Sequence, residues 1–385
     1  MEPAVKKKIE SYLDYLLQGS TAEAPLWNQE IIRSGKPNSW NYIDGCMITA
    51  ILSMYEQSGK TEYLAFADNF CSRFVKEDGT IRTYQAQDYN LDNINPARNL
   101  ISLYTLTGKE KYRKAVENVR AQLQSQPRTK EGNFWHKKIY PDQVWLDGLY
   151  MAQPFYMTYE TRFNGMRGCG DSFRQFVNVR KHMRDADTGL YYHAYDASKS
   201  MSWADQETGC SRNFWLRAEG WFAGALVDTA EAMDEQLYYE YRTLQSMLKE
   251  LMDALIPWQD ESGMFYQVID HPEDQRNYLE TSGTALIAYA ALKGVRLGYL
   301  PERYEEIGVR AMDGIVKKHL ITNEDGTPGL SGICLVAGLG NPASRDGSLG
   351  YYFSEPVVSN DAKGTAPFLM AYTELERMRD GMTRI

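Results

Sequence analysis

Residues 52–70 read LSMYEQSGKTEYLAFADNF, and residues 101–119 repeat this pattern as ISLYTLTGKEKYRKAVENV. The two copies lie 49 residues apart, and identical residues coincide in them, including Gly59 with Gly108 and Lys60 with Lys109. Because glycine commonly ends an α-helix in the left-handed conformation, each copy is interpreted as a helix, a glycine cap and a second helix. Such αα-hairpins bury their apolar faces by stacking on neighbouring copies. The repeat therefore predicts an all-α fold built from helical hairpins.

Helical segments along the whole chain fall into two alternating families. The first family lies near residues 3–18, 61–77, 109–124, 169–185, 237–255 and 302–319. The second is more apolar and richer in alanine and glycine, which suits helices packed on several sides, and lies near residues 40–58, 93–106, 144–161, 214–232, 280–297 and 361–379. Alternating outer and inner helices predict a closed (α/α)6 barrel. An open solenoid is the alternative, although the period and caps of common helical repeats are not apparent.

Length and charge limit the class of protein. The chain has 385 residues, more than the roughly 250 to 300 at which single cores usually stop growing, so two domains or one large closed architecture is expected. The helix alternation favours a single domain over residues 1–385. A net charge of −9 argues against a nucleic acid or an anionic membrane as partner. No stretch approaches the roughly 18 apolar residues of a membrane-spanning helix.

The cysteines and the N-terminal sequence indicate a compartment. The five cysteines are scattered and odd in number, which is typical of reduced thiols rather than of a disulfide framework or a zinc site. The first residues become amphipathic directly after a basic triplet, without a signal-peptide core. A cytoplasmic protein is therefore expected. Neither a metal nor a cofactor is expected, because no metal-ligand spacing and no nucleotide-binding fingerprint is found.

Four short segments with a glycine and alternating aromatic residues precede inner helices. Residues 79–84, 132–138, 189–196 and 263–270 are interpreted as short strands or β-hairpins. If each leads into an inner helix, all of them lie at the end of the barrel where the inner helices begin. Helix N-termini favour anionic ligands, and loops on a rigid scaffold usually carry function. This rim is the predicted site.

Charged and aromatic residues gather on the predicted rim. They are Trp40, Tyr42, Asp88, Asp92, His136, Lys137, Asp147, His193, Trp215, Arg217, Trp221, Glu280 and Lys363. Ordinary structural interpretations exist: Asp147 could only complement a helix dipole, Arg217 could pair with Glu219, and Trp215 and Trp221 could belong to the core. Together, however, basic groups that grip a carboxylate and aromatic faces that stack on sugar rings indicate a pocket for an acidic sugar.

Five motifs carry a resemblance to a known enzyme family. They are LDNINPAR (91–98), FWHKKIYPDQVWLDGLYM (134–151), TGLYYHAYD (188–196), FWLRAEGWFAGAL (214–226) and SNDAKGTAPFL (359–369), of which the second is the most specific. Through them the sequence resembles, over nearly its whole length, the unsaturated rhamnogalacturonyl hydrolases of glycoside hydrolase family 105. It resembles more distantly the unsaturated glucuronyl hydrolases of family 88. The fold of these families is an (α/α)6 barrel, in agreement with the helix pattern.

The resemblance implies a role for each matching residue. Asp147 is the implied general acid and base, and Asp92 is the second carboxylate near the reacting ring. The implied substrate contacts are Tyr42, Lys137, His193, Trp215, Arg217 and Trp221. Two positions depart from the family pattern. Glu219 replaces an asparagine, so an extra carboxylate could enter the pocket, and Pro96 must lie in the first turn of its helix to be tolerated.

The implied reaction is hydration of a double bond. Its substrate is a small oligosaccharide whose non-reducing end carries the 4,5-unsaturated uronic acid left by a polysaccharide lyase, in particular unsaturated galacturonyl-rhamnose from the pectin component rhamnogalacturonan. Asp147 protonates C4 and then deprotonates the water that adds at C5, and the resulting hemiketal opens. Alternatives are an unsaturated glucuronyl hydrolase acting on glycosaminoglycan-type disaccharides, a lyase or epimerase on the same barrel, and a non-catalytic binding module.

Overall fold

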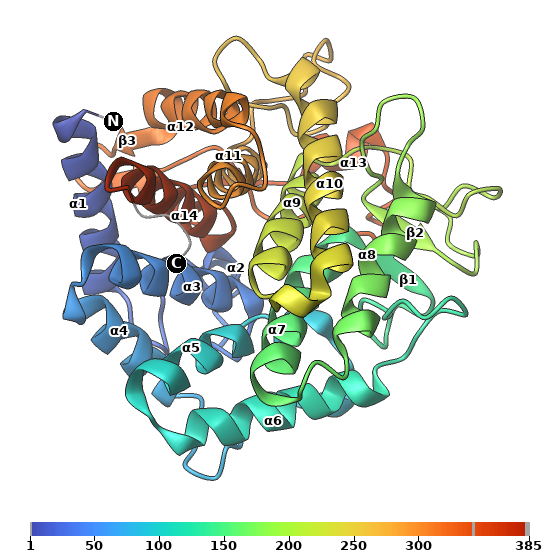
Figure 1. Ribbon diagram of the computed structural model, residues 1–385. Helices are drawn as coiled ribbons and strands as arrows, with labels where there is room; N and C mark the ends of the chain where they lie inside the picture. Colours follow the sequence, from blue (N-terminus) through green and yellow to red (C-terminus); the bar gives the residue numbers. More distant parts are fainter. Residues whose placement is uncertain (1, 341–342, 382–385) are drawn as a thin grey trace.

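The computed structural model describes residues 2–340 and 343–381, and this part of the chain is mostly helical. Six long helices surround the centre of the molecule and six others lie outside them (Figure 1). The inner helices are α3 (Tyr42–Ser58), α5 (Ala97–Thr107), α7 (Leu146–Phe163), α9 (Leu216–Glu231), α11 (Thr281–Arg296) and α14 (Ala362–Arg379). The outer helices are α1 (Pro3–Gly19), α4 (Thr61–Ser72), α6 (Glu110–Ser125), α8 (Cys169–Met183), α10 (Tyr238–Leu255) and α12 (Glu305–His319). Every helix predicted from the sequence is present.

The inner helices contact one another in a ring. Around the ring, each inner helix contacts the next, in the order α3, α5, α7, α9, α11 and α14. Contacts between α14 and α3 close the ring. Outer helices α4, α6, α8 and α10 pack on α3, α5, α7 and α9 respectively, and α12 packs on α11 and also contacts α14. The outer helix α1 reaches α14 through the hydroxyl of Tyr12, which lies 3.0 Å from that of Thr365. The arrangement explains why the inner helices are buried on several sides, whereas the outer helices bury a single face.

Glycines allow the inner helices to approach closely. An added Cβ at Gly220 of α9 would lie 2.6 Å from the Cβ of Leu286 in α11. An added Cβ at Gly283 of α11 would lie 2.9 Å from the carbonyl carbon of Leu216. Both distances are shorter than real Cβ contacts. The small residues of the inner family therefore set the spacing between neighbouring helices.

Short elements complete the described chain. The sequence did not predict α2 (Gln29–Ser34) or α13 (Leu349–Ser354), and it did not predict the 3-10 helices η1 (Ala86–Asp88), η2 (Leu91–Asn93), η3 (Glu235–Leu237) and η4 (Ile256–Trp258). The 3-10 helix η5 (Glu302–Tyr304) forms the start of the helix predicted near residues 302–319. Three antiparallel strand pairs are formed: β1 (Gln143–Trp145) with β2 (Ala194–Asp196), β3 (Leu320–Thr322) with β4 (Pro328–Leu330), and β5 (Ile333–Cys334) with β6 (Val357–Val358). In the first pair, Trp145 lies opposite Ala194.

The predicted strands are only partly correct. Of the four glycine-aromatic segments, residues 189–196 alone contain a strand, β2, whereas the other three form isolated bridges such as Arg128 with Phe134. In two of these three segments, a backbone N–H binds a side chain of a neighbouring helix. The N–H of Phe134 donates to Gln175 Oε1 and that of Phe265 to Thr284 Oγ1. A ladder cannot extend where its donors are already used.

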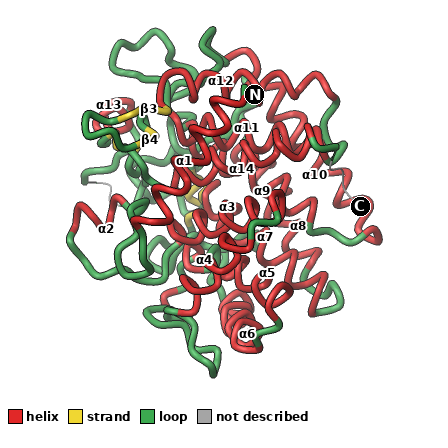
Figure 2. The backbone as a smooth tube through the Cα atoms, turned by 90° about the vertical axis from the view of Figure 1, so that its left-hand side faces the viewer, coloured by secondary structure: helices red, strands yellow, loops and turns green. Residues whose placement is uncertain are grey.

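One backbone hydrogen bond recurs where the inner helices begin. The N–H of Leu146 donates to the carbonyl of His193 at 3.1 Å, and that of Leu216 to the carbonyl of Gln267 at 3.0 Å. The same bond joins Thr281 to Gly332, Ala362 to Trp27 and, in the turn before α5, Leu91 to His136. A helix begins with N–H groups that have no partner inside the helix, and the next segment supplies that partner here. Figure 2 shows most of the loops, with α2 and α13, on one side of the molecule.

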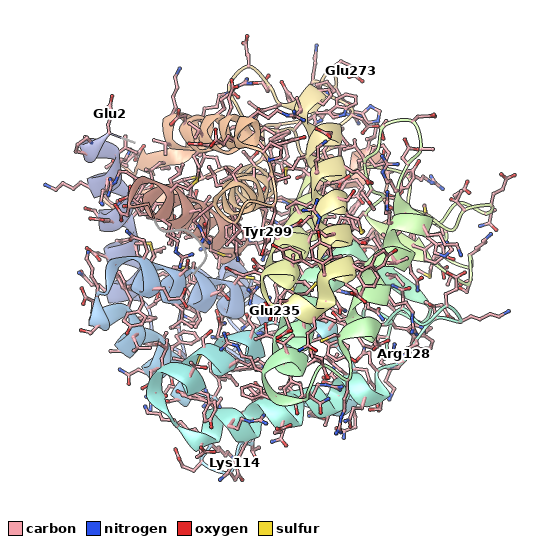
Figure 3. The ribbon with its side chains drawn as sticks, in the orientation of Figure 1. Glu2, Lys114, Arg128, Glu235, Glu273 and Tyr299 are labelled. Atoms are coloured by element: carbon pink, nitrogen blue, oxygen red, sulfur yellow. The ribbon has the colours of Figure 1, made fainter. Side chains whose placement is uncertain are left out.

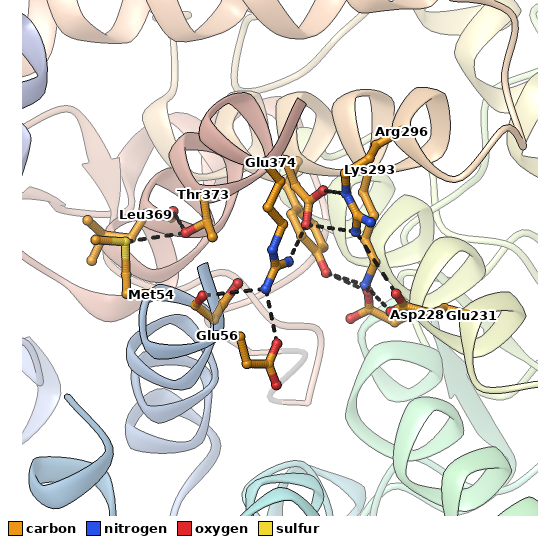
Figure 4. Close-up of polar contacts among 12 residues, drawn as sticks. Met54, Glu56, Asp228, Glu231, Lys293, Arg296, Leu369, Thr373 and Glu374 are labelled. Atoms are coloured by element: carbon orange, nitrogen blue, oxygen red, sulfur yellow. Dashed lines mark hydrogen bonds and ion pairs between the residues drawn. The ribbon is translucent and has the colours of Figure 1, made fainter. Parts of the chain in front are cut away.

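The opposite end of the ring is tied by buried ion pairs (Figure 4). Asp228 of α9 lies 2.6 Å from Lys293 of α11 and 2.9 Å from Arg98 of α5. Glu374 of α14 binds Arg296 of α11 and also Arg377 of its own helix. Charged side chains on the outside, such as those of Lys114 and Glu273, project into solvent (Figure 3). None of the described helices has the length and apolar character needed to cross a membrane.

Candidate active site

Five polar residues occupy one equivalent position in the ring. Each directly follows the residue whose N–H binds the next segment: Asp92 after Leu91, Asp147 after Leu146, Arg217 after Leu216, Ser282 after Thr281 and Lys363 after Ala362. In every case the second residue of an inner helix, or of the turn preceding α5, enters the same end of the ring. The recurrent bond therefore brings residues far apart in sequence to one site.

Asp92 is held by Lys137. Its Oδ2 lies 2.6 Å from Lys137 Nζ, and its Oδ1 lies 3.3 Å from Nε2 of His136. Burial favours the neutral carboxyl, but the charge and the hydrogen bond of Lys137 outweigh burial and hold the pKa of Asp92 below its ordinary value. Asp92 is therefore a carboxylate at neutral pH.

His136 is packed into an aromatic stack. Its ring lies nearly parallel to that of Trp145 with centroids 4.5 Å apart, and Tyr140 lies nearly parallel to the same indole at 5.2 Å. Burial lowers the pKa of His136 to about 4, so the imidazole is neutral at pH 7. Gly148 of α7 makes room for it, because an added Cβ would lie 3.0 Å from His136 Nδ1.

Asp147 has different surroundings from Asp92. Its Oδ2 lies 3.4 Å from Nε2 of His193, which is its sole ion-pair partner among the described residues. That oxygen is fully buried without a hydrogen-bond partner, although the side chain as a whole is 14% exposed. On the other side of the imidazole, His193 Nδ1 lies 2.8 Å from the hydroxyl of Tyr352. Asp147 thus faces the site without a lysine or arginine to hold its charge.

Arg217 and Trp215 lie together at the start of α9. The guanidinium lies 4.8 Å from the Trp215 ring, and Trp215 packs on His193 with centroids 4.6 Å apart. Arg217 donates to the carbonyl of Cys334 and, at 3.2 Å, to the hydroxyl of Ser282. Its Nε is buried and has no partner in the described chain. Arg217 therefore keeps unused donor capacity inside the site.

Glu219 does not enter the site, contrary to the expectation from the sequence. It is completely buried and accepts a hydrogen bond from the N–H of Tyr191. Burial raises its pKa well above the ordinary value and so favours the neutral carboxyl. The suggested Arg217–Glu219 pair is also wrong, because Arg217 binds Cys334 and Ser282 instead. Pro96 was expected in the first turn of its helix, and it lies directly before that turn, as the N-cap of α5 with a φ of −64°. Its missing N–H is tolerated there, because this position needs no donor within the helix.

Tyr42 lies at the first position of α3 beside a second charged group. Lys363 Nζ lies 6.0 Å from its ring centroid. Lys363 is completely buried, with its Nζ 2.8 Å from Glu30 and 3.2 Å from Asp361. Burial raises the pKa of the Tyr42 hydroxyl well above its ordinary value, and the negative charge of Glu30 adds to this effect. Tyr42 therefore presents a protonated hydroxyl.

Other predicted rim residues have structural contacts. Trp221 lies one turn after Arg217 in α9, is buried, and packs on Tyr150 with centroids 4.6 Å apart. Trp40 donates its indole N–H to the carbonyl of Asn93. Glu280 caps α11 by accepting from the N–H of Gly283, and Asp88 is exposed. The described part of the chain contains no group of three or more His, Cys, Asp or Glu residues placed to hold a metal ion.

Sequence reasoning missed Tyr352. Its helix α13 has a local signal, because Ser348 caps it by accepting from the N–H of Tyr351. That signal predicts a short helix, but it does not reveal that the next tyrosine reaches His193, more than 150 residues earlier in the chain. Gln267, whose amide donates to Cys334 Sγ at 3.2 Å, was missed for the same reason.

A two-layered ring of helices with two carboxylates, cations and aromatic faces at one end is compatible with a helical glycosidase, and the family comparison identifies this class. The model of Glycosyl Hydrolase Family 88 matches residues 22–379, and the chain belongs to this family.

Similar proteins agree with this assignment. A structure of C. acetobutylicum ATCC 824 glycoside hydrolase from family 105 is 42% identical, covers 97% of this chain and 99% of its own, and has a TM-score of 0.88. The unsaturated rhamnogalacturonyl hydrolase YesR of Bacillus subtilis is 26% identical over 67% of this chain and 72% of its own length. The unsaturated glucuronyl hydrolase of Bacillus sp. GL1 is 14% identical, covers 98% of both chains and has a TM-score of 0.69, which concerns the fold alone.

Proposed function

We propose that this protein removes a 4,5-unsaturated uronic acid from the non-reducing end of lyase-generated oligosaccharides by hydrating the C4=C5 double bond. We further interpret the ring of helices as an (α/α)6 barrel that forms a single catalytic domain over residues 1–385. The observation that carries the proposal is the contrast between two carboxylates at equivalent positions. Asp92 is held as an anion by Lys137, whereas Asp147 has a histidine as its neighbour and faces the site.

The contrast suits acid-catalysed hydration. Protonated Asp147 gives its proton to C4, and positive charge develops at C5 and the ring oxygen. The fixed anion Asp92 stabilises that charge. A water molecule adds at C5 and returns a proton to Asp147. The C5 hemiketal opens by breaking the bond between C5 and the ring oxygen, and the hemiacetal then exposed at C1 releases the rest of the saccharide as an alcohol.

Arg217 is the proposed partner of the uronate carboxylate. Lys137 is engaged by Asp92, whereas Arg217 has a buried Nε without a partner. Its guanidinium lies against Trp215, and the positive ends of the inner helices favour an anion at the same place. His193 holds Asp147, and the protonated hydroxyl of Tyr42 provides a hydrogen-bond donor. Trp221 then acts indirectly, because its packing on Tyr150 supports α9.

For the substrate we propose unsaturated galacturonyl-rhamnose, and with it a role in pectin degradation. The support is the resemblance of the motifs and the similarity to YesR, whose name states that activity. An unsaturated glucuronyl disaccharide is the alternative. The proposal includes a cytoplasmic location, which agrees with five free, buried cysteines.

Loss of the ultraviolet absorbance of the conjugated unsaturated uronate tests the reaction. The wild type should remove this absorbance, and Asp147→Asn should lower kcat by at least about 100-fold, because a general acid contributes about 10² to 10⁴. Asp187→Asn, at an exposed position, is the control and should behave as the wild type. An unchanged rate in Asp147→Asn would refute the assigned role.

The substrate separates the alternatives. Unsaturated galacturonyl-rhamnose should react faster than unsaturated glucuronyl disaccharides, and the reverse order would favour the glucuronyl hydrolase. New absorbance from a saturated oligosaccharide would identify a lyase, and a changed sugar configuration without cleavage would identify an epimerase. Binding without any conversion would leave a non-catalytic module.

A further inference from the structure

Behind Asp147 lies a histidine whose second nitrogen is held by a tyrosine from a distant helix. His193 is completely buried, and its Nδ1 lies 2.8 Å from the hydroxyl of Tyr352 in α13. Its Nε2 lies 3.4 Å from Asp147 Oδ2. Both atoms are buried, and neither has a hydrogen-bond partner in the described chain. Tyr352 of α13, His193 before β2 and Asp147 of α7 therefore form one line of side chains that ends at the carboxylate.

The ring of His193 cannot turn freely. It packs on Trp215 with centroids 4.6 Å apart and meets the edge of Trp145 at 5.6 Å. Its own carbonyl accepts the first N–H of α7 from Leu146. Packing and the backbone thus fix the position of the imidazole, and one variable is left, namely which nitrogen carries the proton.

Counting the protons of Tyr352 and His193 decides which nitrogen of the imidazole is protonated. A neutral imidazole has one N–H and one lone pair. The Tyr352 hydroxyl stays protonated, because burial raises its pKa well above the ordinary value. In the described chain its one hydrogen-bond partner is His193 Nδ1. If Nδ1 carried the proton, the hydroxyl hydrogen would be a buried donor without an acceptor, at a cost of about 1 to 3 kcal/mol. The hydroxyl therefore donates to Nδ1, and the ring proton resides on Nε2.

We infer that Tyr352 is a positioning residue that fixes His193 as the Nε2–H tautomer, which holds Oδ2 of Asp147 and leaves Oδ1 to exchange the proton. The inference deepens the proposed function and rests on it, because it takes Asp147 as the acid and base. A neutral N–H donor stabilises the carboxylate after the proton has left, and it adds no positive charge beside a developing cation. The exposure of Asp147 agrees with this division, since Oδ2 is fully buried in a side chain that is 14% exposed.

The tautomer can be measured without an activity assay. In long-range ¹H–¹⁵N spectra of the labelled protein at neutral pH, His193 should show a protonated Nε2 and an unprotonated Nδ1. His193→Gln identifies its signals, because they disappear in this variant. Tyr352→Phe keeps the ring that packs near Trp215 but removes the donor, so Nδ1–H should become populated. An Nδ1–H tautomer or an imidazolium in the wild type would overturn the inference, as would an unchanged tautomer in Tyr352→Phe.

Kinetics test the consequence for catalysis. Tyr352→Phe should lower kcat by about 10- to 100-fold, by analogy with the loss of a hydrogen-bond partner that orients a metal-ligating histidine, and should change KM less than about twofold. Tyr351→Phe is the matched control. It removes a neighbouring buried hydroxyl that binds Gly338, so it should cost similar thermal stability and leave kcat unchanged. Equal losses of kcat in both variants would assign Tyr352 a structural role and contradict the inference.

A double mutant separates positioning from stability. Glutamine at position 193 can offer an N–H to Asp147 whatever the state of Tyr352, so Tyr352→Phe should have little further effect in the His193→Gln background. Additive losses would overturn the inference. If the wild type shows the Nε2–H tautomer but does not consume the unsaturated uronide, the proposed function fails while the tautomer assignment stands. If the uronide is consumed and the tautomer is the other one, the inference alone fails.

Discussion

At the scale of single residues, the two carboxylates differ through their neighbours. Asp92 and Asp147 occupy equivalent positions after the same backbone hydrogen bond, and each has a histidine nearby. Lys137 accompanies only the first, at 2.6 Å. In the proposed mechanism, this lysine separates the fixed anion Asp92 from the acid and base Asp147. Environments that differ in this way typically divide such roles between two carboxylates.

Lys137→Met tests this division through the pH dependence of activity. In the wild type, Lys137 lowers the pKa of Asp92 against the effect of burial. Without the lysine, burial remains and raises the pKa, so Asp92 becomes ionised only at higher pH. The acidic limb of the profile of kcat/KM should therefore move to higher pH by at least about one unit. Initial rates on the unsaturated disaccharide from pH 4 to pH 9 measure the shift.

The neighbouring Lys138 provides the control. It is exposed, and its Nζ lies 5.8 Å from the ring of Tyr89. Lys138→Met removes the same charge from the same loop without touching Asp92, so its acidic limb should stay where it is in the wild type. A similar shift in both variants would mean that the overall charge, rather than the contact with Asp92, determines the pH at which the acidic limb of kcat/KM lies.

At the scale of helices and strands, local signals predict elements but not their contacts. Gly59 and Gly108 end their helices with φ values of 70° and 68°, as the repeat indicates. Periodicity locates the inner and outer helices, and their order brings Asp92, Lys137, Asp147 and His193 to one end. The isolated bridges were not predictable, because Gln175 and Thr284 compete for the strand donors from distant helices. Glu219 was misplaced because helical spacing does not reveal which buried N–H a carboxyl meets.

Gly283→Ala tests the spacing of α9 and α11. The added Cβ would lie 2.9 Å from the carbonyl carbon of Leu216 and also against its side chain, so the two helices must move apart. Overpacking of this kind costs about 1 to 3 kcal/mol. Because Leu216 precedes Arg217, kcat/KM should fall as well. Urea unfolding and the absorbance assay measure the two effects.

Gly170→Ala is the matched control in the outer layer. Gly170 lies in α8, and an added Cβ there meets nothing within 4 Å. The better helix propensity of alanine should stabilise this variant by about 0.5 to 1 kcal/mol, and activity should not change. Destabilisation in both variants would show that the glycines serve the helix backbone rather than the distance between α9 and α11.

At the scale of the whole molecule, the two ends of the ring have different tasks. The end where the inner helices begin holds the unpartnered atoms of Asp147, His193 and Arg217. At the other end, acids and bases are paired with one another, as Asp228 is with Lys293 (Figure 4). Asp228 also binds Arg98. Such pairs link α5, α9 and α11 far from the site. The stability of the ring can therefore be changed without altering the chemistry.

Asp228→Asn should destabilise the protein and leave kcat within about twofold of the wild type. Loss of one partner of a buried ion pair costs about 3 to 5 kcal/mol. A cost near the smaller of these values is expected, because Lys293 still has Glu231 as an ion-pair partner at 2.7 Å. Burial opposes the charge of Asp228, but Lys293 and Arg98 lower its pKa to about 2. A carboxyl whose pKa is lowered in the folded state stabilises the fold at pH values above 3.8, its pKa in the unfolded chain. This contribution is lost as the pH falls towards 2, the pKa in the folded state.

The difference in unfolding free energy between Asp228→Asn and the wild type should therefore shrink by about 2 kcal/mol between pH 7 and pH 2, since one pKa unit corresponds to about 1.4 kcal/mol. Urea titrations at several pH values measure it. Glu77→Gln removes a carboxylate that is 87% exposed beside Lys111, and exposed pairs contribute less than about 1 kcal/mol, so this control should differ little from the wild type at any pH. If the destabilisation by Asp228→Asn did not depend on pH, its origin would be lost packing, and the ion pairs would not be what ties this end of the ring.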